Sequence, residues 1–265
     1  MLRRGLSSFN VTAEDQARFD QFNLEREKAW LAILLAWVAG FVDVLGFLTL
    51  IHVFTSHMSG NSVSAGANFA RGNFSEAGRS ASPVPGFVFG VLIGTILGIV
   101  AARCGIRRRA SIALAVEIAC LLAYMLYGST LLHAGNLSSI SVPNFVLLTS
   151  LLAFAMGLQN ATLRRVRGFS VHTGFVTGML TQCAEDAAIG LVHIYDWLRR
   201  ASPDSAARRM HRRRMILAGG VWLTFAVGGM CGGLSQQRWN LHALVLPIAV
   251  LAIVILCDFF HPIHE

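Results

Sequence analysis

One acidic residue, Asp43, interrupts an apolar stretch at residues 30–54 that is long enough to cross a lipid bilayer. An ionisable group near the centre of a span costs about 2.5 to 3.5 kcal/mol on insertion scales, so we expect it to face a partner, a water-filled cavity or an ion. Gly40 and Gly46 lie within about one helical turn and permit a close neighbour or a local break. Asp43 is therefore a candidate for binding a proton or an ion. A hydrogen bond that only joins two helices is the alternative.

The string His57-Met58-Ser59-Gly60-Asn61 follows this stretch and brings an imidazole, a hydroxyl and an amide to what should be membrane depth. Irregular backbone at that depth is tolerated only inside protein or against water. A helix that begins near Ser59 would direct unpaired N–H groups into that space, which favours polar or anionic solutes. His57 could titrate near neutral pH, or it could be an ordinary residue at the end of a span.

A second set of polar residues lies in the other half of the chain, without an acid: Gln159, Asn160, Thr177 and Gly178. We expect them, together with the first set, to lie at the midplane of the membrane. Asn160 would then stand opposite Asp43 as a neutral partner, an asymmetry that could serve the coupling of protons or ions.

Glu117 lies about one and a half helical turns inside the apolar stretch at residues 111–132. It is either an interfacial residue or a second buried acid, and it joins the candidates for the polar midplane. Glu185 and Asp186, near the end of a less apolar stretch, are expected to be solvated.

The composition identifies the class of protein that holds these residues. Only 14% of the 265 residues are charged and 54% are hydrophobic, with a mean hydropathy of +0.58, whereas soluble domains carry about a quarter charged residues. Six stretches approach the roughly 20 residues of a membrane helix; they are residues 30–54, 86–102, 111–132, 144–163, 215–234 and 241–259. Two weaker segments lie at residues 57–70 and 169–198. We therefore predict an all-α integral membrane protein with about six transmembrane helices and two short re-entrant or broken helices, or alternatively seven or eight spans.

The net charge of +8 does not indicate nucleic-acid binding, because the arginines cluster beside the apolar stretches. The blocks at residues 103–109, 164–167 and 199–214 follow the pattern of cytoplasmic loops. They predict a multi-pass protein of a bacterial inner membrane with both termini in the cytoplasm and with residues 71–85 as an external polar linker. An eight-span arrangement would place one of the two later blocks outside.

The expected organisation is an N-terminal arm at residues 1–29, in which residues 13–28 could form a surface helix, one membrane domain at residues 30–259, and a tail at residues 260–265. The five cysteines form no CxxC or Cys/His pattern. We therefore expect no metal site and no cofactor.

The membrane domain contains an internal repeat. Gly40-Phe41-Val42-Asp43 aligns with Gly157-Leu158-Gln159-Asn160, and Met58-Ser59-Gly60-Asn61 aligns with Val176-Thr177-Gly178-Met179. Each half, about residues 30–133 and 144–259, then holds three full spans, and an odd number of spans places the two halves in opposite orientation. Such inverted repeats are typical of transporters that bind their solute near the midplane.

Glycines four residues apart occur in both halves and let helix backbones approach closely in lipid. They are Gly86, Gly90, Gly94 and Gly98 in the first half, and Gly228 and Gly232 in the second. The sequence leaves open whether they pack helices within one chain or join two copies in a homo-oligomer.

Four strings, in order along the chain, resemble the YoaK-like family of uncharacterised bacterial inner-membrane proteins; they are Ala39-Gly40-Phe41-Val42-Asp43, His57-Met58-Ser59-Gly60-Asn61, Gly157-Leu158-Gln159-Asn160 and Val176-Thr177-Gly178-Met179. The resemblance covers about residues 30–259. It implies a multi-pass inner-membrane protein with these strings as signature positions, and it implies no activity.

The function that these patterns favour is transport of a small solute or ion along a path between the two halves. A structural or regulatory protein, whose basic loop at residues 199–214 contacts anionic lipid, is the alternative. An intramembrane enzyme is disfavoured, because the sequence contains no HExxH, GxSxG or paired-carboxylate motif.

Overall fold

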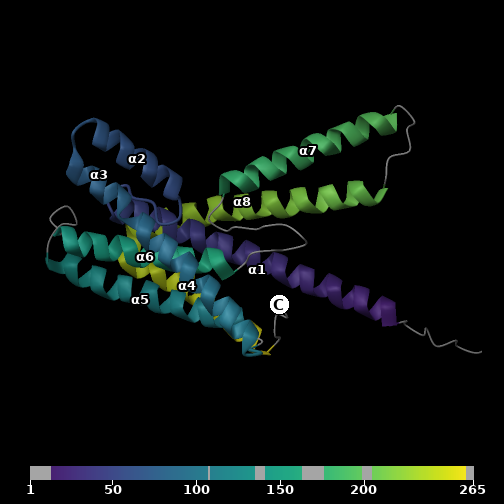
Figure 1. The fold of residues 1–265 in the computed structure, drawn as a ribbon, viewed down its shortest axis with the longest axis horizontal. Helices are drawn as coiled ribbons and strands as arrows, with labels where there is room; N and C mark the ends of the chain where they lie inside the picture. Colours follow the sequence, from purple (N-terminus) through teal and green to yellow (C-terminus); the bar gives the residue numbers. More distant parts are fainter. Residues whose placement is uncertain (1–12, 107, 135–140, 163–175, 199–204, 261–265) are drawn as a thin grey trace, which may run out of the picture.

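In the computed structural model, the described part of the chain comprises residues 13–106, 108–134, 141–162, 176–198 and 205–260. Every regular element within it is a helix, which confirms the predicted all-α membrane class. The helices are α1 (Ala13–Thr49), α2 (Met58–Ala70), α3 (Phe74–Ala81), α4 (Pro83–Arg103), α5 (Arg109–Ala134), α6 (Val142–Thr162), α7 (Val176–Leu198), α8 (Ser205–Trp239), the 3-10 turn η2 (Asn240–Leu244) and α9 (Val245–Phe260) (Figure 1).

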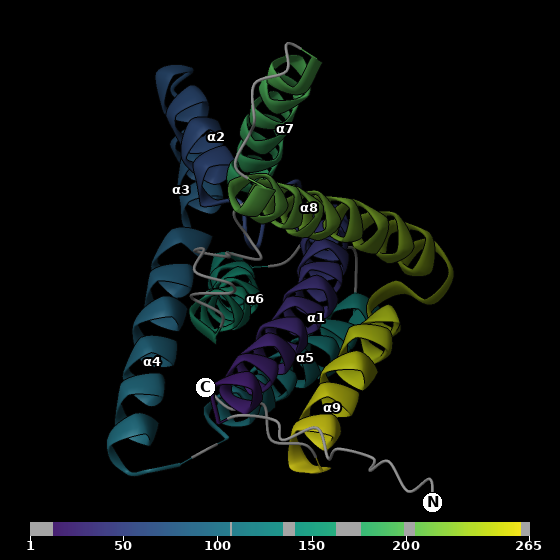
Figure 2. The same ribbon diagram turned by 90° about the vertical axis from the view of Figure 1, so that its right-hand side faces the viewer.

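Five helical stretches in the described residues are long and apolar enough to cross a membrane. Four of them lie in α1, in α3 with α4, in α5 and in α6. The fifth, Arg209–Phe260, is 52 residues long and contains both α8 and α9. Figure 2 shows the chain turning between the end of α8 and α9, so this stretch contains two helices rather than one. Five candidate stretches, of which one holds two helices, agree with the prediction of about six transmembrane helices.

The two weak segments of the sequence become helices of different length. α2 has 13 residues, or roughly 20 Å at ~1.5 Å per residue, which is short of a bilayer core of about 30 Å. α7 has 23 residues and reaches roughly 35 Å. The length of α2 therefore disfavours the eight-span alternative, whereas that of α7 suits a crossing or a re-entrant helix equally well.

The expected polar linker at residues 71–85 is largely helical instead. Asn73 caps α3 by accepting a hydrogen bond from the backbone N–H of Glu76, and Pro83 begins α4 at a position that suits proline. These local signals override the polar composition of the segment. Residues 13–28 do not form a separate surface helix. They are the first part of α1, which extends beyond the bundle (Figure 1).

Close backbone contacts join α1 to α8 and α4 to α6. At each contact a glycine of one helix lies against a backbone carbonyl group of the other, so that an added Cβ atom would overlap the carbonyl oxygen. The pairs are Gly40 with Phe225, Gly228 with Trp37, and Gly232 with Phe41 between α1 and α8, and Gly157 with Phe87, Gly90 with Phe154, and Gly86 with Ser150 between α4 and α6.

Gly94 extends the α4 row toward Leu158 and Ala161 of α6. The sequence predicts that Gly98 continues the row, but an added Cβ at Gly98 would meet no atom within 4 Å in the described structure. The glycine contact therefore ends one turn earlier than expected, at the level where α6 ends at Thr162.

These contacts predict opposite effects for two substitutions in one helix. Gly90→Ala should destabilise the protein by about 1–3 kcal/mol, because its methyl group has no room beside the Phe154 carbonyl. Gly98→Ala, the matched control, should leave stability unchanged or raise it, because alanine favours a helix. Thermal unfolding of the two variants in lipid nanodiscs measures the difference, and equal melting temperatures would contradict the packing described here.

Candidate functional site: the carboxylate of Asp43

The site begins where α1 ends. The helix stops at Thr49 rather than at the expected residue 54, and the chain reverses through Ile51 and His52, whose φ angles are 53° and 62°. Such left-handed angles are rare outside glycine and are strained for the β-branched Ile51. The backbone N–H of His52 closes the turn by donating to the Phe47 carbonyl at 3.0 Å. The turn directs residues 53–57 back alongside α1.

Asp43 is therefore closer to one end of its span than the sequence suggests. It lies roughly 21 Å along the helix from Ala29 and roughly 9 Å before Thr49, at ~1.5 Å per residue. Its side chain is buried. The returning segment, and not a distant helix, is what it faces.

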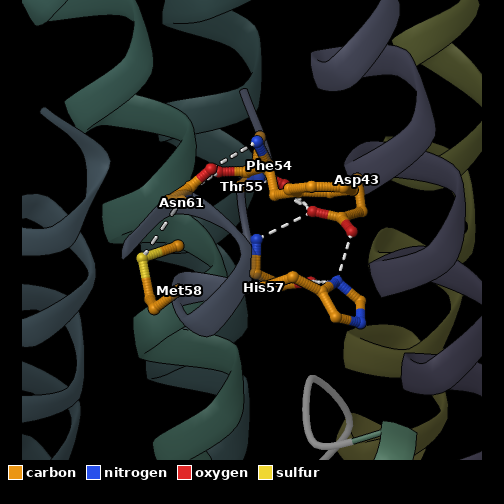
Figure 3. A network of polar contacts seen from close by, with 7 residues as sticks. Asp43, Phe54, Thr55, His57, Met58 and Asn61 are labelled. Carbon is orange, nitrogen blue, oxygen red and sulfur yellow. Dashed lines mark hydrogen bonds and ion pairs between the residues drawn. The ribbon is translucent and has the colours of Figure 1, made fainter. Parts of the chain in front are cut away.

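The carboxylate of Asp43 binds the returning segment directly (Figure 3). Its Oδ1 accepts hydrogen bonds from the Thr55 backbone N–H at 2.8 Å, the Thr55 hydroxyl at 2.9 Å and the Ser56 backbone N–H at 2.8 Å. Hydrogen bonds to an ionised acceptor are the stronger kind, and these pair backbone groups that a buried turn would otherwise leave unpaired. Asp43 thus fixes the start of α2 against α1.

His57 completes the carboxylate's contacts. Its Nδ1 lies 2.6 Å from Oδ2 of Asp43 and 3.2 Å from the Ser56 hydroxyl, and 27% of its side chain is exposed. The hydrogen bond to Asp43 raises the pKa of His57 above its usual value of 6.5, although burial of the ring opposes this shift. With Nδ1 directed at the carboxylate, Nε2 is the ring atom that can take up or release a proton.

The ring of His57 also connects the two halves of the chain. It packs against Phe54 of the returning segment and edge-on against Phe225 of α8, with centroid distances of 5.6 Å and 5.4 Å. The pair of Asp43 and His57 therefore lies where α1, α2 and α8 meet.

Asn61 holds the returning segment from the other side. Its side-chain amide donates to the Phe54 carbonyl at 2.7 Å and accepts from the Phe54 N–H at 2.9 Å. Gly60 lies beside the same phenylalanine, whose ring would be 3.0 Å from an added Cβ. Ser59 is exposed. The structure thus brings His57 and Asn61 into the network around the returning segment, packs Gly60 against Phe54 and leaves Ser59 outside.

The polar residues of the second half are more dispersed. Gln159 is buried and donates from Nε2 to the Leu35 carbonyl at 3.1 Å, which joins α6 to α1. Asn160 is half-buried, and its Oδ1 has no hydrogen-bond partner among the described residues. Thr177 and Gly178 lie in the first turn of α7, exposed and half-buried respectively. None of these four has a hydrogen bond to Asp43 in the described part of the chain.

Glu117 is a buried acid rather than an interfacial one. Its side chain is 0% exposed in α5, and neither carboxyl oxygen has a hydrogen-bond partner within the described structure. Glu117 is thus separate from the network around Asp43.

Sequence reasoning missed several residues of the polar interior. Thr55 and Ser56 supply most of the donors to Asp43, and their position just before the His57 string was the available signal. Asp186, expected to be solvated, is buried and lies 2.8 Å from Nδ1 of His211, so it joins α7 to α8. In the described residues, no three His, Cys, Asp or Glu side chains lie close enough to bind a metal ion.

Comparison with known proteins places these features in one family. The model of the family described as "Protein of unknown function (DUF1275)" matches residues 31–257. The "UPF0700 transmembrane protein YoaK" of Bacillus subtilis (strain 168) is 30% identical over 162 residues, which are 59% of this chain and 65% of that protein, just under two thirds of its length. No solved structure matches the chain. These matches confirm the resemblance to the uncharacterised YoaK-like membrane proteins.

The raised pKa of His57 predicts a dependence of stability on pH. The folded protein holds this proton more tightly than the unfolded chain, so the pair stabilises the fold fully below a pH of about 6.5, and the contribution is lost as the pH rises through the higher folded-state pKa. Melting temperatures of the purified protein should fall across that range.

The substitution His57→Gln should remove this pH-dependent component of the melting temperature. His52→Gln is the matched control, because the His52 ring packs edge-on against Phe47 and should leave the dependence intact. The same slope with pH in the wild type and in His57→Gln would show that another group titrates.

Proposed function

This chain belongs to the DUF1275 family of proteins of unknown function, and we propose that it is a transporter or channel for a small solute or ion. The observation that carries the proposal is the pair of Asp43 and His57, a carboxylate and an imidazole 2.6 Å apart beside a membrane-crossing helix. Ionisable groups at membrane depth are rare and usually mark ion or substrate pathways.

The proposed path runs between two halves of opposite orientation. The glycine contacts support this, because one constant shift in residue number relates α1 to α6 and another relates α4 to α8. The corresponding pairs are Gly40–Phe225 with Gly157–Phe87, Gly228–Trp37 with Gly90–Phe154, and Gly232–Phe41 with Gly94–Leu158. In both contacts the first helix of one half packs on the third helical stretch of the other half: α1 on α8, and α6 on α4.

The two weak segments also support an inverted arrangement. α2 begins at Met58 and α7 at Val176, the positions that the sequence alignment of the halves pairs. Figure 1 shows α2 extending toward one end of the bundle and α7 toward the opposite end. This is the arrangement expected of two re-entrant helices that enter from opposite faces of the membrane.

The charged residues support the assignment of sides. The beginning of α1, the end of α4, the beginning of α5 and the beginning of α8 lie toward the same end of the bundle in Figure 1. In the sequence, Arg103, Arg109 and Arg209 belong to these helix ends. Cytoplasmic loops collect arginine, so we assign this end to the cytoplasm of a bacterial inner membrane, together with both termini.

Within this arrangement the polar residues have distinct roles. Asp43 and His57 exchange the ion or proton, and Asn61 keeps the returning segment in place beside them. Gln159, Asn160, Thr177 and Gly178 are the neutral lining contributed by the second half. The Oδ1 of Asn160, at the position equivalent to Asp43, has no partner among the described residues and would accept a hydrogen bond from a polar solute.

A structural or regulatory protein is the second candidate function. It is favoured by the fact that the contacts of Asp43 also lock the returning segment onto α1. In that case the carboxylate stabilises the fold without taking part in transport.

Reconstituted protein tests the two candidates. Proteoliposomes are challenged with amino acids, organic anions, organic cations and inorganic ions, while charge displacement and internal pH are recorded. At least one class should give a signal that protein-free liposomes lack. Asp43→Asn, which keeps an oxygen for the Thr55 and Ser56 N–H groups, should abolish it.

Asp186→Asn is the matched control, because Asp186 forms a similar buried pair with His211 elsewhere in the protein and should leave the signal intact. Undiminished flux in a folded Asp43→Asn variant would support the structural role and contradict transport through this site. The absence of a signal for every class would contradict transport altogether.

A further inference from the structure

Glu117 is a buried acid outside the site around Asp43, and it differs from Asp186 and Asp258 because it has no hydrogen-bond partner among the described residues. It lies in the span Arg109–Leu131 and is completely buried, and both carboxyl oxygens lack a hydrogen-bond partner among the described residues. Leu114, Cys120 and Leu121 surround it on the same face of α5 and are buried as well. An ionised carboxylate in such surroundings is very costly, and a neutral carboxylic acid is far less so.

The surroundings of Glu117 select the ligand that it can bind. A metal cation such as Ca²⁺ needs six or more oxygen ligands, whereas the face of α5 around Glu117 presents aliphatic carbon and one thiol. An anion would be repelled by the carboxylate. A proton needs no further ligand and removes the charge, so it is the cation that suits a buried carboxyl group without hydrogen-bond partners in the described structure.

The helices packed against α5 bring few other ionisable groups. α6 has none in its sequence, η2 contributes the exposed His242, and α9 contributes Cys257 and Asp258. α4 contributes only Arg103, at its end. Residues 29–49 of α1, which the hydrogen bond between Thr49 and Tyr124 joins to α5, contribute only Asp43, which is bound by Thr55, Ser56 and His57. On α5 itself, Cys120 and Tyr124 share the buried face.

The carboxylate of Asp258 already has a hydrogen-bond partner, because it accepts from the hydroxyl of Ser111 near the beginning of α5. In the described structure, no basic side chain of a neighbouring helix pairs with the Glu117 carboxyl group, so only a proton neutralises its charge.

Glu117 also lies level with Asp43. The Tyr124 hydroxyl and the Thr49 hydroxyl are 2.8 Å apart and link α5 to α1. Glu117 precedes Tyr124 by roughly 10 Å and Asp43 precedes Thr49 by roughly 9 Å, at ~1.5 Å per residue. Figure 1 shows α1 and α5 running in the same direction, so the two acids lie at a similar depth in different helices.

We propose that Glu117 is a proton-binding site and that the transported species moves in exchange with, or together with, the proton that Glu117 carries. This inference rests on the proposed transport function and names the coupling ion. Glu117 takes up one proton as a carboxylate and becomes a neutral carboxylic acid in the buried state described here. It returns the proton to water when the packing of α5 opens during the transport cycle.

Infrared spectroscopy of the protein in lipid detects the protonated acid without any transported solute. The wild type should show the carbonyl band of a protonated carboxylic acid, which shifts in deuterated buffer. Glu117→Gln should lack this band. Asp258→Asn is the matched control, because Asp258 is buried but hydrogen-bonded, and the band should remain. A spectrum that is unchanged by Glu117→Gln would overturn the proposal.

Proteoliposome flux then tests the coupling. A solute signal driven by a pH gradient should be lost in Glu117→Gln, whereas exchange of the same solute across equal pH should persist, and Asp258→Asn should retain both. If gradient-driven flux survives Glu117→Gln, Glu117 is not the coupling site although the protein still transports. If the wild type transports nothing, the proposed function fails and the coupling role fails with it, whatever the infrared band shows.

Discussion

Helices in a bilayer gain little by hiding apolar side chains from surrounding hydrocarbon, so they associate where their backbones can approach closely. In this chain α1 meets α8, and α4 meets α6, at glycines that leave no room for a side chain. Gly40 brings the backbone of α1 against the Phe225 carbonyl, and the ring of the same phenylalanine packs against His57. The contact that joins the helices therefore also determines where the pair of Asp43 and His57 meets the second half of the chain.

The carboxylate of Asp43 solves a second problem that the membrane imposes. The chain turns back after α1, and its backbone N–H groups need partners in a region where water is scarce. One carboxyl oxygen accepts three hydrogen bonds from Thr55 and Ser56, and the other is left for His57. The same group thus secures the fold and keeps an ionisable pair at the junction of three helices. A strained turn at Ile51 and His52 is held in place by these bonds.

The sequence alone was sufficient for the features that depend on local pattern. Apolar length gave the spans, and the isolated Asp43 and the string from His57 to Asn61 indicated a polar centre. Features that depend on contacts between distant parts of the chain were missed. They are the donors at Thr55 and Ser56, the buried contact between Asp186 and His211, and the end of close helix packing before Gly98. Each needs a partner from elsewhere in the chain, and no periodicity records which helices meet.

The proposed transport path requires the two halves to have opposite orientations in the membrane. Ser75, in α3, and Arg209, in α8, are exposed and lie near the beginning of the third helical stretch of each half. Each is replaced by cysteine in a cysteine-free background, and a membrane-impermeant maleimide is applied to intact cells and to inverted vesicles. Opposite orientations predict labelling of position 75 from the outside only and of position 209 from the cytoplasm only. Labelling of both positions from the same side would contradict it.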